Sequence, residues 1–208
     1  MSIDRLKKYL ARYARKMAQD GLTIGSSGNL SARLGGKFYI KATGRPFEEI
    51  KSSDFVGLSV DRPDVKGLRK TPSCEYRLHA TCYGNRPDIK AVFHTHPFFA
   101  AVAFSQGVCN KPVTMEFAAY IGRDITSIEF IAPGSPDLAR ALNIASRKHD
   151  CIIMKKHGII TLGKTMQDAY LKNLIIEREA KAQTIRRLLR MKGACFTSRE
   201  MAMLAGAV

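Results

Sequence analysis

Segment 91–97, Ala-Val-Phe-His-Thr-His-Pro, constrains the fold most, because it is an apolar run that ends on two histidines one residue apart. In a β-strand, the side chains at positions i and i+2 lie on the same face. His94 and His96 can therefore reach one ion together, and we expect a strand here. Neutral imidazole suits zinc and its divalent neighbours, and three protein ligands leave a position open for a substrate. An isolated His-x-His pair can equally be the ordinary end of a strand.

Two further segments contain residues that would complete a metal site. His157 stands in a Lys-Lys-His-Gly sequence and Glu75 in a Pro-Ser-Cys-Glu sequence, so we expect metal binding. Glu75 could be a fourth ligand that substrate oxygens displace, or a general base beside the metal. His79 shares a helix face with Glu75, but we interpret it as a buried, hydrogen-bonded histidine. We expect His149 at the surface.

Three short segments combine small residues with hydroxyl groups: residues 25–29, Thr43-Gly44 and Ser73-Cys74. Where side chains are small, backbone N–H groups can converge on an anion. Ser73 is expected at a helix N-terminus, where the helix dipole favours a phosphate. Alone, the first segment is also compatible with a plain tight turn, but together the three predict one phosphate-binding cup.

Length and composition predict a single domain over residues 1–208. The chain has 208 residues, of which 45% are hydrophobic, enough for one substantial core without a polar linker. No apolar run approaches the ~20 residues that span a bilayer, and the N-terminal segment lacks a signal-peptide core. Five scattered cysteines without a Cys-x-x-Cys pair fit a reducing compartment, with most thiols buried. We therefore expect a cytoplasmic protein without a membrane partner.

The net charge of +16 has two interpretations, attraction of an anionic substrate or a nucleic-acid surface. Much of the excess lies in segments 3–20 and 166–190, whose patterns are those of amphipathic helices with solvated basic faces. The chain has no Trp, and its aromatic residues do not alternate with basic ones as a single-strand stacking surface requires. We expect no specific nucleic-acid partner.

The hydrophobic periodicity predicts helices and strands that alternate around the centre of the chain. Thr71 or Ser73 is expected to cap the helix that holds Glu75 in its first turn. The fold class is α/β/α, a central mixed or antiparallel sheet with helices on both faces. The expected helices are 3–20, 71–84, 136–149 and 166–190, the expected strands are 30–34, 37–41, 54–60, 91–96, 127–131, 151–156 and 159–162, and 100–105 is a strand or short helix.

Five motifs in register resemble the class II aldolase/adducin family, and most closely its fuculose-1-phosphate aldolase branch. The order and spacing agree from about residue 5 to about residue 185. Each motif alone is common, but five together are specific. They are Gly-Ser-Ser-Gly-Asn-Leu-Ser at 25–31, Thr43-Gly44, Pro-Ser-Cys-Glu at 72–75 with Arg-Pro-Asp at 86–88, His-Thr-His at 94–96 and Lys-His-Gly at 156–158.

The resemblance implies an α/β/α fold and a divalent metal, usually Zn²⁺ or otherwise Co²⁺, Mn²⁺ or Fe²⁺, on His94, His96 and His157. It implies that Glu75 is a metal ligand and the catalytic acid/base. It further implies a small phosphorylated sugar as substrate, and a cyclic homotetramer with sites at subunit interfaces. The tail from about residue 191 would contact a neighbouring subunit. The implied phosphate cup consists of Ser26, Gly28, Asn29, Thr43, Gly44, Ser73 and Cys74.

The chain departs from the aldolase pattern at the residues that handle protons and phosphate. Aldolases carry a proton-donating tyrosine four residues before a Gly-Ser/Thr pair, and that position is Phe130. They also use a tyrosine from the C-terminal tail, yet no tyrosine follows Tyr170. Cys74 replaces a serine, which removes a hydroxyl donor to phosphate. Tyr120 could substitute from another loop.

The first functional hypothesis is a metal-dependent lyase that cleaves a small phosphorylated keto-sugar through a metal-stabilised enediolate of dihydroxyacetone phosphate. A metal-dependent dehydratase or decarboxylase of a related sugar phosphate is the alternative, and the missing tyrosine favours it. An epimerase fits less well, because that branch has an aspartate at the position of Glu75. A metal-free, adducin-like or nucleic-acid-associated scaffold is disfavoured by the retention of all three histidines.

Overall fold

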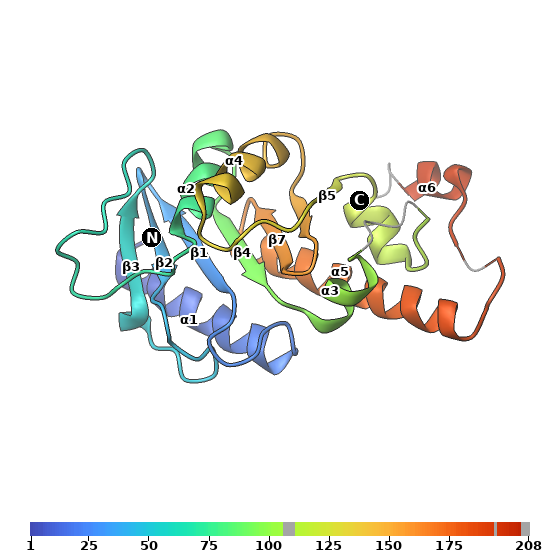
Figure 1. The fold of residues 1–208 in the computed structure, drawn as a ribbon, viewed down its shortest axis with the longest axis horizontal. Coiled ribbons are helices and arrows are strands. Elements are labelled where there is room, and N and C mark those ends of the chain that lie inside the picture. Colours follow the sequence, from blue (N-terminus) through green and yellow to red (C-terminus); the bar gives the residue numbers. More distant parts are fainter. Residues whose placement is uncertain (106–110, 194, 205–208) are drawn as a thin grey trace.

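A seven-stranded sheet forms the centre of the molecule in this computed structural model, which describes residues 1–105, 111–193 and 195–204 (Figure 1). The strand order is β3-β2-β1-β4-β7-β6-β5. Neighbouring strands are antiparallel except β5 and β6, which are parallel. The strands are β1 (Asn29–Leu34), β2 (Lys37–Lys41), β3 (Phe55–Ser59), β4 (Ala91–Thr95), β5 (Ile125–Ile128), β6 (Cys151–Met154) and β7 (Gly158–Gly163).

Helices cover both faces of this sheet, which confirms the predicted α/β/α class. Helices α2 and α4 pack on one face, and α1, α3 and α5 on the other, as Figure 1 shows above and below the strands. The helices are α1 (Ile3–Gln19), α2 (Tyr76–Asn85), α3 (Phe98–Ala103), α4 (Pro136–Ala145), α5 (Met166–Leu188) and α6 (Ser198–Leu204), with a 3₁₀ turn η1 (Ser52–Asp54) and a π-helical turn η2 (Phe117–Ile121).

Strand β4 is buried along its whole length because both of its faces meet a hydrophobic core. Val92 belongs to the core beneath α2 and α4, whereas Ala91 and Phe93 belong to the core beneath α1. Side chains alternate along a strand, so His94 shares the face of Val92. The sheet therefore presents His94 toward the start of α2.

The structure corrects several predicted boundaries. The helix expected from residue 71 begins at Tyr76, with Glu75 at its N-cap, so neither Thr71 nor Ser73 caps it. Ser73 instead forms a turn, in which its carbonyl oxygen accepts from the N–H of Tyr76 at 3.1 Å. The strand expected at 127–131 lies at 125–128, segment 100–105 falls in the short helix α3 and its end, and the helix expected at 136–149 ends at Ala145. Helix α6 was not predicted.

The basic residues of α1 follow the predicted solvated pattern. Leu6, Leu10 and Met17 are buried on its inner face, while Arg5 and Arg12 are exposed.

In the described part of the chain, no helix is both long and apolar enough to cross a membrane. The four described cysteines are free, and two of them, Cys82 and Cys151, are buried; Cys109 lies outside the described residues.

Candidate active site

Three histidines meet at the end of the sheet near α2. His94 lies in β4, His96 directly follows it, and His157 stands in the turn between β6 and β7. Strand β7 pairs with β4, which brings the turn beside the His-x-His segment. One ligand atom from each of the three rings lies within 4.8 Å of the others, close enough to hold one metal ion.

Glu75 joins these histidines from the start of α2. Its Oε2 lies 3.2 Å from His94 Nε2, and its Oε1 lies 3.7 Å from His157 Nε2. Asn29 Nδ2 donates a hydrogen bond to Oε2 at 2.8 Å, whereas Oε1 is buried without a hydrogen-bond partner among the described residues. Glu75 thus has one oxygen held in place and one that is free.

The electrostatics of the site favour an ionised Glu75 carboxylate and neutral His96 and His157 rings. Burial alone would raise the pKa of Glu75, but His94, His157 and the Asn29 amide outweigh it and hold the pKa well below its usual range. Burial, together with the neighbouring His94, lowers the pKa of His96 to about 3 and that of His157 to about 4. Neutral imidazole is the form that binds a metal.

The donor set fits a divalent cation. His94 Nδ1 lies 3.0 Å from the carbonyl oxygen of Ile159, so Nδ1 carries a proton, and in the neutral ring Nε2 is the nitrogen that can bind a metal. That Nε2 lies 3.0 Å from His96 Nε2 and 3.2 Å from Glu75 Oε2. Two imidazole nitrogens and one carboxylate oxygen thus converge. Their lone pairs repel one another unless a proton or a metal ion lies among them. Imidazole nitrogen with carboxylate oxygen is the ligand set of zinc and its neighbours.

Two glycines allow the strands to approach so closely. A Cβ at Gly158 would lie 2.7 Å from His96 Cδ2 and would overlap the carbonyl oxygen of Thr95. A Cβ at Gly28 would lie 2.7 Å from the carbonyl oxygen of His94, and Gly28 also has φ +80°. The glycine-rich turn is therefore packed against the histidine strand.

The predicted phosphate residues lie on three segments that adjoin one another. Thr43 N–H donates to the Thr71 carbonyl at 3.0 Å, and Ser73 N–H donates to the Lys41 carbonyl at 3.0 Å, so these two segments run side by side. Among the described residues, the N–H groups of Ser26, Gly28, Gly44 and Cys74 have no hydrogen-bond partner. Asn29 and Ser73 are buried, whereas Ser26, Thr43, Gly44 and Cys74 are exposed. Asn29 differs from the others, because its side chain is bonded to Glu75 and His79.

The sequence analysis did not single out Lys41, which lies beside the glycine-rich turn. The Lys41 side chain is buried, and its Nζ donates to the Ser26 carbonyl at 3.0 Å, which ties the glycine-rich turn to β2. No described carboxylate forms an ion pair with Lys41. The only hint in the sequence is that Lys41 directly follows three apolar residues, 38–40, of a predicted strand. His79 is fully buried and hydrogen-bonded, as expected, and burial lowers its pKa to about 3.

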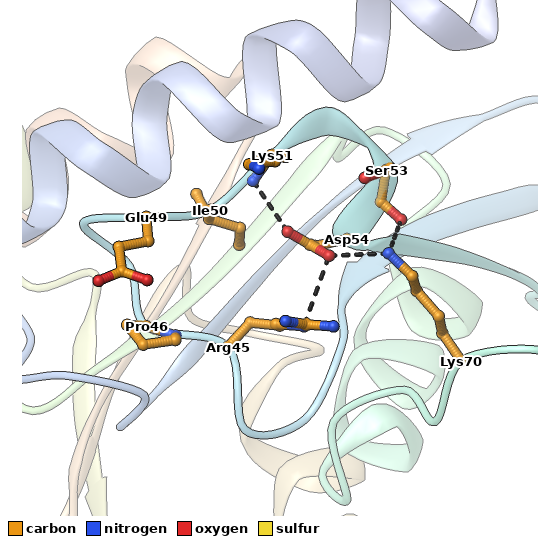
Figure 2. Close-up of a pocket in the computed structure, with 8 residues that line it drawn as sticks. All are labelled: Arg45, Pro46, Glu49, Ile50, Lys51, Ser53, Asp54 and Lys70. Carbon is orange, nitrogen blue, oxygen red and sulfur yellow. Dashed lines mark hydrogen bonds and ion pairs between the residues drawn. The ribbon is translucent and has the colours of Figure 1, made fainter.

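A cavity of about 580 Å³ lies away from the histidines, around η1 (Figure 2). Asp54 sits at its centre and accepts from the backbone N–H of Lys51 at 2.9 Å and from Lys70 Nζ at 2.8 Å. Arg45 Nε lies 3.5 Å from the same carboxylate. Asp54 pairs with both Arg45 and Lys70, and no histidine lines this pocket, so we place the chemistry at the histidine cluster instead.

Phe130 follows β5 and is 56% exposed, and Tyr120 in η2 is 52% exposed. A Cβ at Gly134 would lie 3.3 Å from the Cys74 carbonyl oxygen. The segment that contains Phe130 therefore passes beside the phosphate residues.

Comparisons with known proteins agree with this geometry. Residues 8–184 match the class II aldolase and adducin N-terminal domain. L-fuculose phosphate aldolase of Methanocaldococcus jannaschii is 31% identical over 184 residues, which cover 88% of this chain and 98% of that protein. The 5-methylthioribulose-1-phosphate/5-deoxyribulose-1-phosphate aldolase of Escherichia coli is 31% identical over 165 residues, 78% of this chain and 76% of that protein.

A solved structure of an L-fuculose 1-phosphate aldolase superposes with a TM-score of 0.84 and 26% identity, covering 98% of this chain and 95% of that chain. The fold, the order of the motifs and the sequence relatives therefore agree. The chain belongs to the class II aldolase and adducin family, and it is an enzyme of the aldolase type.

Proposed function

We propose that this enzyme is a metal-dependent lyase that cleaves a small phosphorylated keto-sugar by a retro-aldol reaction. One observation carries the proposal: Glu75 Oε1 is buried without a hydrogen-bond partner, 3.7 Å from His157 Nε2, while Oε2 is held by Asn29. A buried, unpaired carboxylate oxygen is costly unless it has a partner during function. A proton acceptor beside a cation site is the arrangement that this reaction needs.

His94, His96 and His157 would hold the metal ion, with Glu75 as a fourth ligand before substrate enters. Zinc is the first candidate, and Co²⁺, Mn²⁺ or Fe²⁺ would suit the same nitrogens. A divalent ion there would supply Lewis acidity that polarises a carbonyl group. Three nitrogens would leave a position for the substrate oxygens.

Glu75 would move the proton at the carbon next to the carbonyl. Its carboxylate is ionised at neutral pH, because its pKa lies well below the usual range. Oε1 is the free atom and would take or return the proton, whereas Oε2 stays bonded to Asn29. The chain thus holds the base in one orientation before substrate arrives.

The substrate phosphate would bind to the cup of Ser26, Gly28, Asn29, Thr43, Gly44, Ser73 and Cys74. The unpaired backbone N–H groups of Ser26, Gly28 and Gly44 supply donors that an anion can use. Lys41 adds a buried positive charge at the carbonyl oxygen of Ser26. The names of two relatives, which act on fuculose phosphate and methylthioribulose phosphate, support a ketose 1-phosphate.

A dehydratase or decarboxylase of a related sugar phosphate is the second candidate, and Phe130 favours it. Aldol cleavage requires a proton to leave the hydroxyl group at the bond that breaks, and a phenyl ring cannot accept it. A reaction whose leaving group is water or carbon dioxide does not need that acceptor. The metal site, Glu75 and the phosphate cup would serve both reactions.

We further propose that the chain acts as one domain within a homotetramer in the cytoplasm. Phe98 and Val102 on α3, the helix that follows His96 in the chain, are 68% and 57% exposed, and exposed apolar patches mark interfaces. The tail from about residue 191 would reach a neighbouring subunit. Helix α6, which has no buried side chain within the single chain, supports this.

The test is to strip the protein of metal, reload it with Zn²⁺, Co²⁺ or Mn²⁺, and offer it fuculose 1-phosphate and 5-methylthioribulose 1-phosphate. Products are identified by mass. Metal-dependent release of dihydroxyacetone phosphate and an aldehyde supports the lyase. Loss of water or carbon dioxide supports the second candidate, and no metal-dependent change in either compound contradicts the proposal.

A further inference from the structure

A chain of buried hydrogen bonds runs from Tyr83 to Glu75 through β1 and α2. Tyr83 OH lies 2.8 Å from Ser31 Oγ, and Ser31 Oγ lies 2.7 Å from His79 Nδ1. On its other side, His79 Nε2 is bonded to Asn29 Oδ1, and Asn29 Nδ2 donates to Glu75 Oε2 at 2.8 Å. All five side chains are buried, and those of Ser31 and His79 are fully enclosed. The chain is therefore a fixed part of the interior that ends on the site.

The carboxylate sets the direction of every hydrogen bond in this chain. An ionised carboxylate can only accept, so Asn29 must present its amide nitrogen to Glu75. The amide oxygen of Asn29 then faces His79, and His79 Nε2 must carry the proton. A neutral imidazole has one N–H, so Nδ1 accepts from the hydroxyl of Ser31. Ser31 in turn accepts from Tyr83.

We propose that His79 is a positioning residue, neutral and protonated on Nε2, that locks the Asn29 amide with its nitrogen toward Glu75. This arrangement holds Oε2 with a hydrogen bond and leaves Oε1, which lies near His157, without one. If the Nε2–H donor were absent, the amide could turn over and place its oxygen against the carboxylate. Repulsion between the two acceptors would then move Glu75. The role of His79 in turnover depends on the proposed function, whereas its tautomer does not.

Histidine-specific ¹⁵N NMR of the zinc-loaded, full-length protein tests the tautomer without any substrate. Near neutral pH, His79 Nε2 should appear as a protonated nitrogen and Nδ1 as an unprotonated one. Assignment comes from comparison with the His79→Gln spectrum, in which these two signals are missing. Protonation of Nδ1, or of both nitrogens, would overturn the inference whatever reaction the enzyme catalyses.

Two variants separate the hydrogen-bond donor from the volume of the ring. His79→Gln keeps an N–H donor at a similar reach toward Asn29, whereas His79→Leu fills space without one. Mutation of a residue that orients a ligand or catalytic group through a hydrogen bond typically lowers activity by about 10- to 100-fold. His79→Leu should therefore lower kcat by that factor, while KM changes by less than about threefold. His79→Gln should recover most of the lost kcat. His149→Leu, at a partly exposed histidine outside the site, is the matched control and should behave like wild type.

Metal content and thermal unfolding of each variant confirm that it is folded and loaded before its kinetics are compared. Equal loss of kcat in folded His79→Gln and His79→Leu would show that only the ring volume matters and would overturn the inference. Full activity of His79→Leu would do the same. If wild type has no lyase activity on any sugar phosphate, the proposed function fails, and the NMR result alone decides the tautomer.

Discussion

The backbone of Gly158 lies against the ring of His96, where a Cβ would stand 2.7 Å from Cδ2 and would overlap the Thr95 carbonyl oxygen. Gly158→Ala should therefore push β7 away from β4. Overpacking of this kind costs about 1–3 kcal/mol, and the displaced His157 should bind metal less tightly. Urea unfolding of the metal-free protein and a zinc titration measure the two effects separately.

Gly84→Ala is the matched control for this substitution. Gly84 lies within α2, and a Cβ there would meet nothing within 4 Å. Alanine in a helix is favoured over glycine by roughly 0.5–1 kcal/mol, so this variant should be more stable and bind zinc normally. Equal stability of Gly158→Ala and Gly84→Ala would show that the close approach does not matter.

Inorganic phosphate should raise the melting temperature, because a ligand of the native state stabilises it by mass action. At tenfold its Kd the gain is about 1.4 kcal/mol. Thr43→Val should remove much of the shift, whereas Thr126→Val on β5 should retain it. Gly28→Val is a poor test, since its Cβ would also strike the His94 carbonyl oxygen. An unchanged shift in Thr43→Val places the anion elsewhere.

Phe130→Tyr should accelerate carbon–carbon cleavage if its hydroxyl lies where related aldolases place theirs. Proton transfer by a positioned side chain contributes about 10²- to 10⁴-fold, and we expect a gain of at least about tenfold. The assay is release of dihydroxyacetone phosphate from fuculose 1-phosphate. Fast wild-type cleavage that Phe130→Tyr leaves unchanged, and that Tyr120→Phe abolishes, would identify Tyr120 as the group that handles this proton.

The free energy of unfolding should rise with pH between about pH 8 and pH 10.5, because Lys41 is buried. Burial lowers the pKa of Lys41 from 10.5 in the unfolded chain to about 8. Between these values the unfolded chain binds more protons, so the free energy of unfolding increases as pH rises, by at most about 3 kcal/mol. Lys41→Met should be more stable than wild type at pH 7, and the difference should shrink toward pH 10.5.

Lys37→Met, at the exposed start of the same strand, is the control for Lys41→Met. It should change the free energy of unfolding little and by the same amount at both pH values. Guanidinium chloride unfolding at the two pH values gives the comparison. A constant difference between wild type and Lys41→Met across this range would refute the depressed pKa.

The parts of the fold with a strong local pattern could be predicted. The apolar run before His94 predicted β4, and the spacing of Leu6, Leu10 and Met17 predicted α1. The strand expected at 127–131 lies at 125–128 because β5 is a half-buried edge strand, paired only with β6 among the described strands, so its hydrophobic pattern is weak. Helix α6 was missed because it is short and none of its side chains is buried.

The site could be predicted only where its chemistry is local in sequence. The His-x-His pair and His157 were identified from ligand type, and their meeting required the pairing of β4 with β7. The contact of Asn29 with Glu75 joins residues 46 positions apart, and that of His79 with Asn29 joins residues 50 apart. No periodicity encodes which side of an amide faces a carboxylate. Asn29 was therefore expected at the phosphate alone.

Deuterium exchange into dihydroxyacetone phosphate tests the central claim most directly, because it needs the metal site and Glu75 but not a proton acceptor at position 130. In D₂O, zinc-loaded wild type should exchange the C–H proton next to the carbonyl, and metal-free protein should not. Glu75→Gln, which keeps an oxygen for Asn29 but loses the basic carboxylate, should bind zinc and fail to exchange. Rapid exchange by zinc-loaded Glu75→Gln, or by metal-free wild type, would contradict the account.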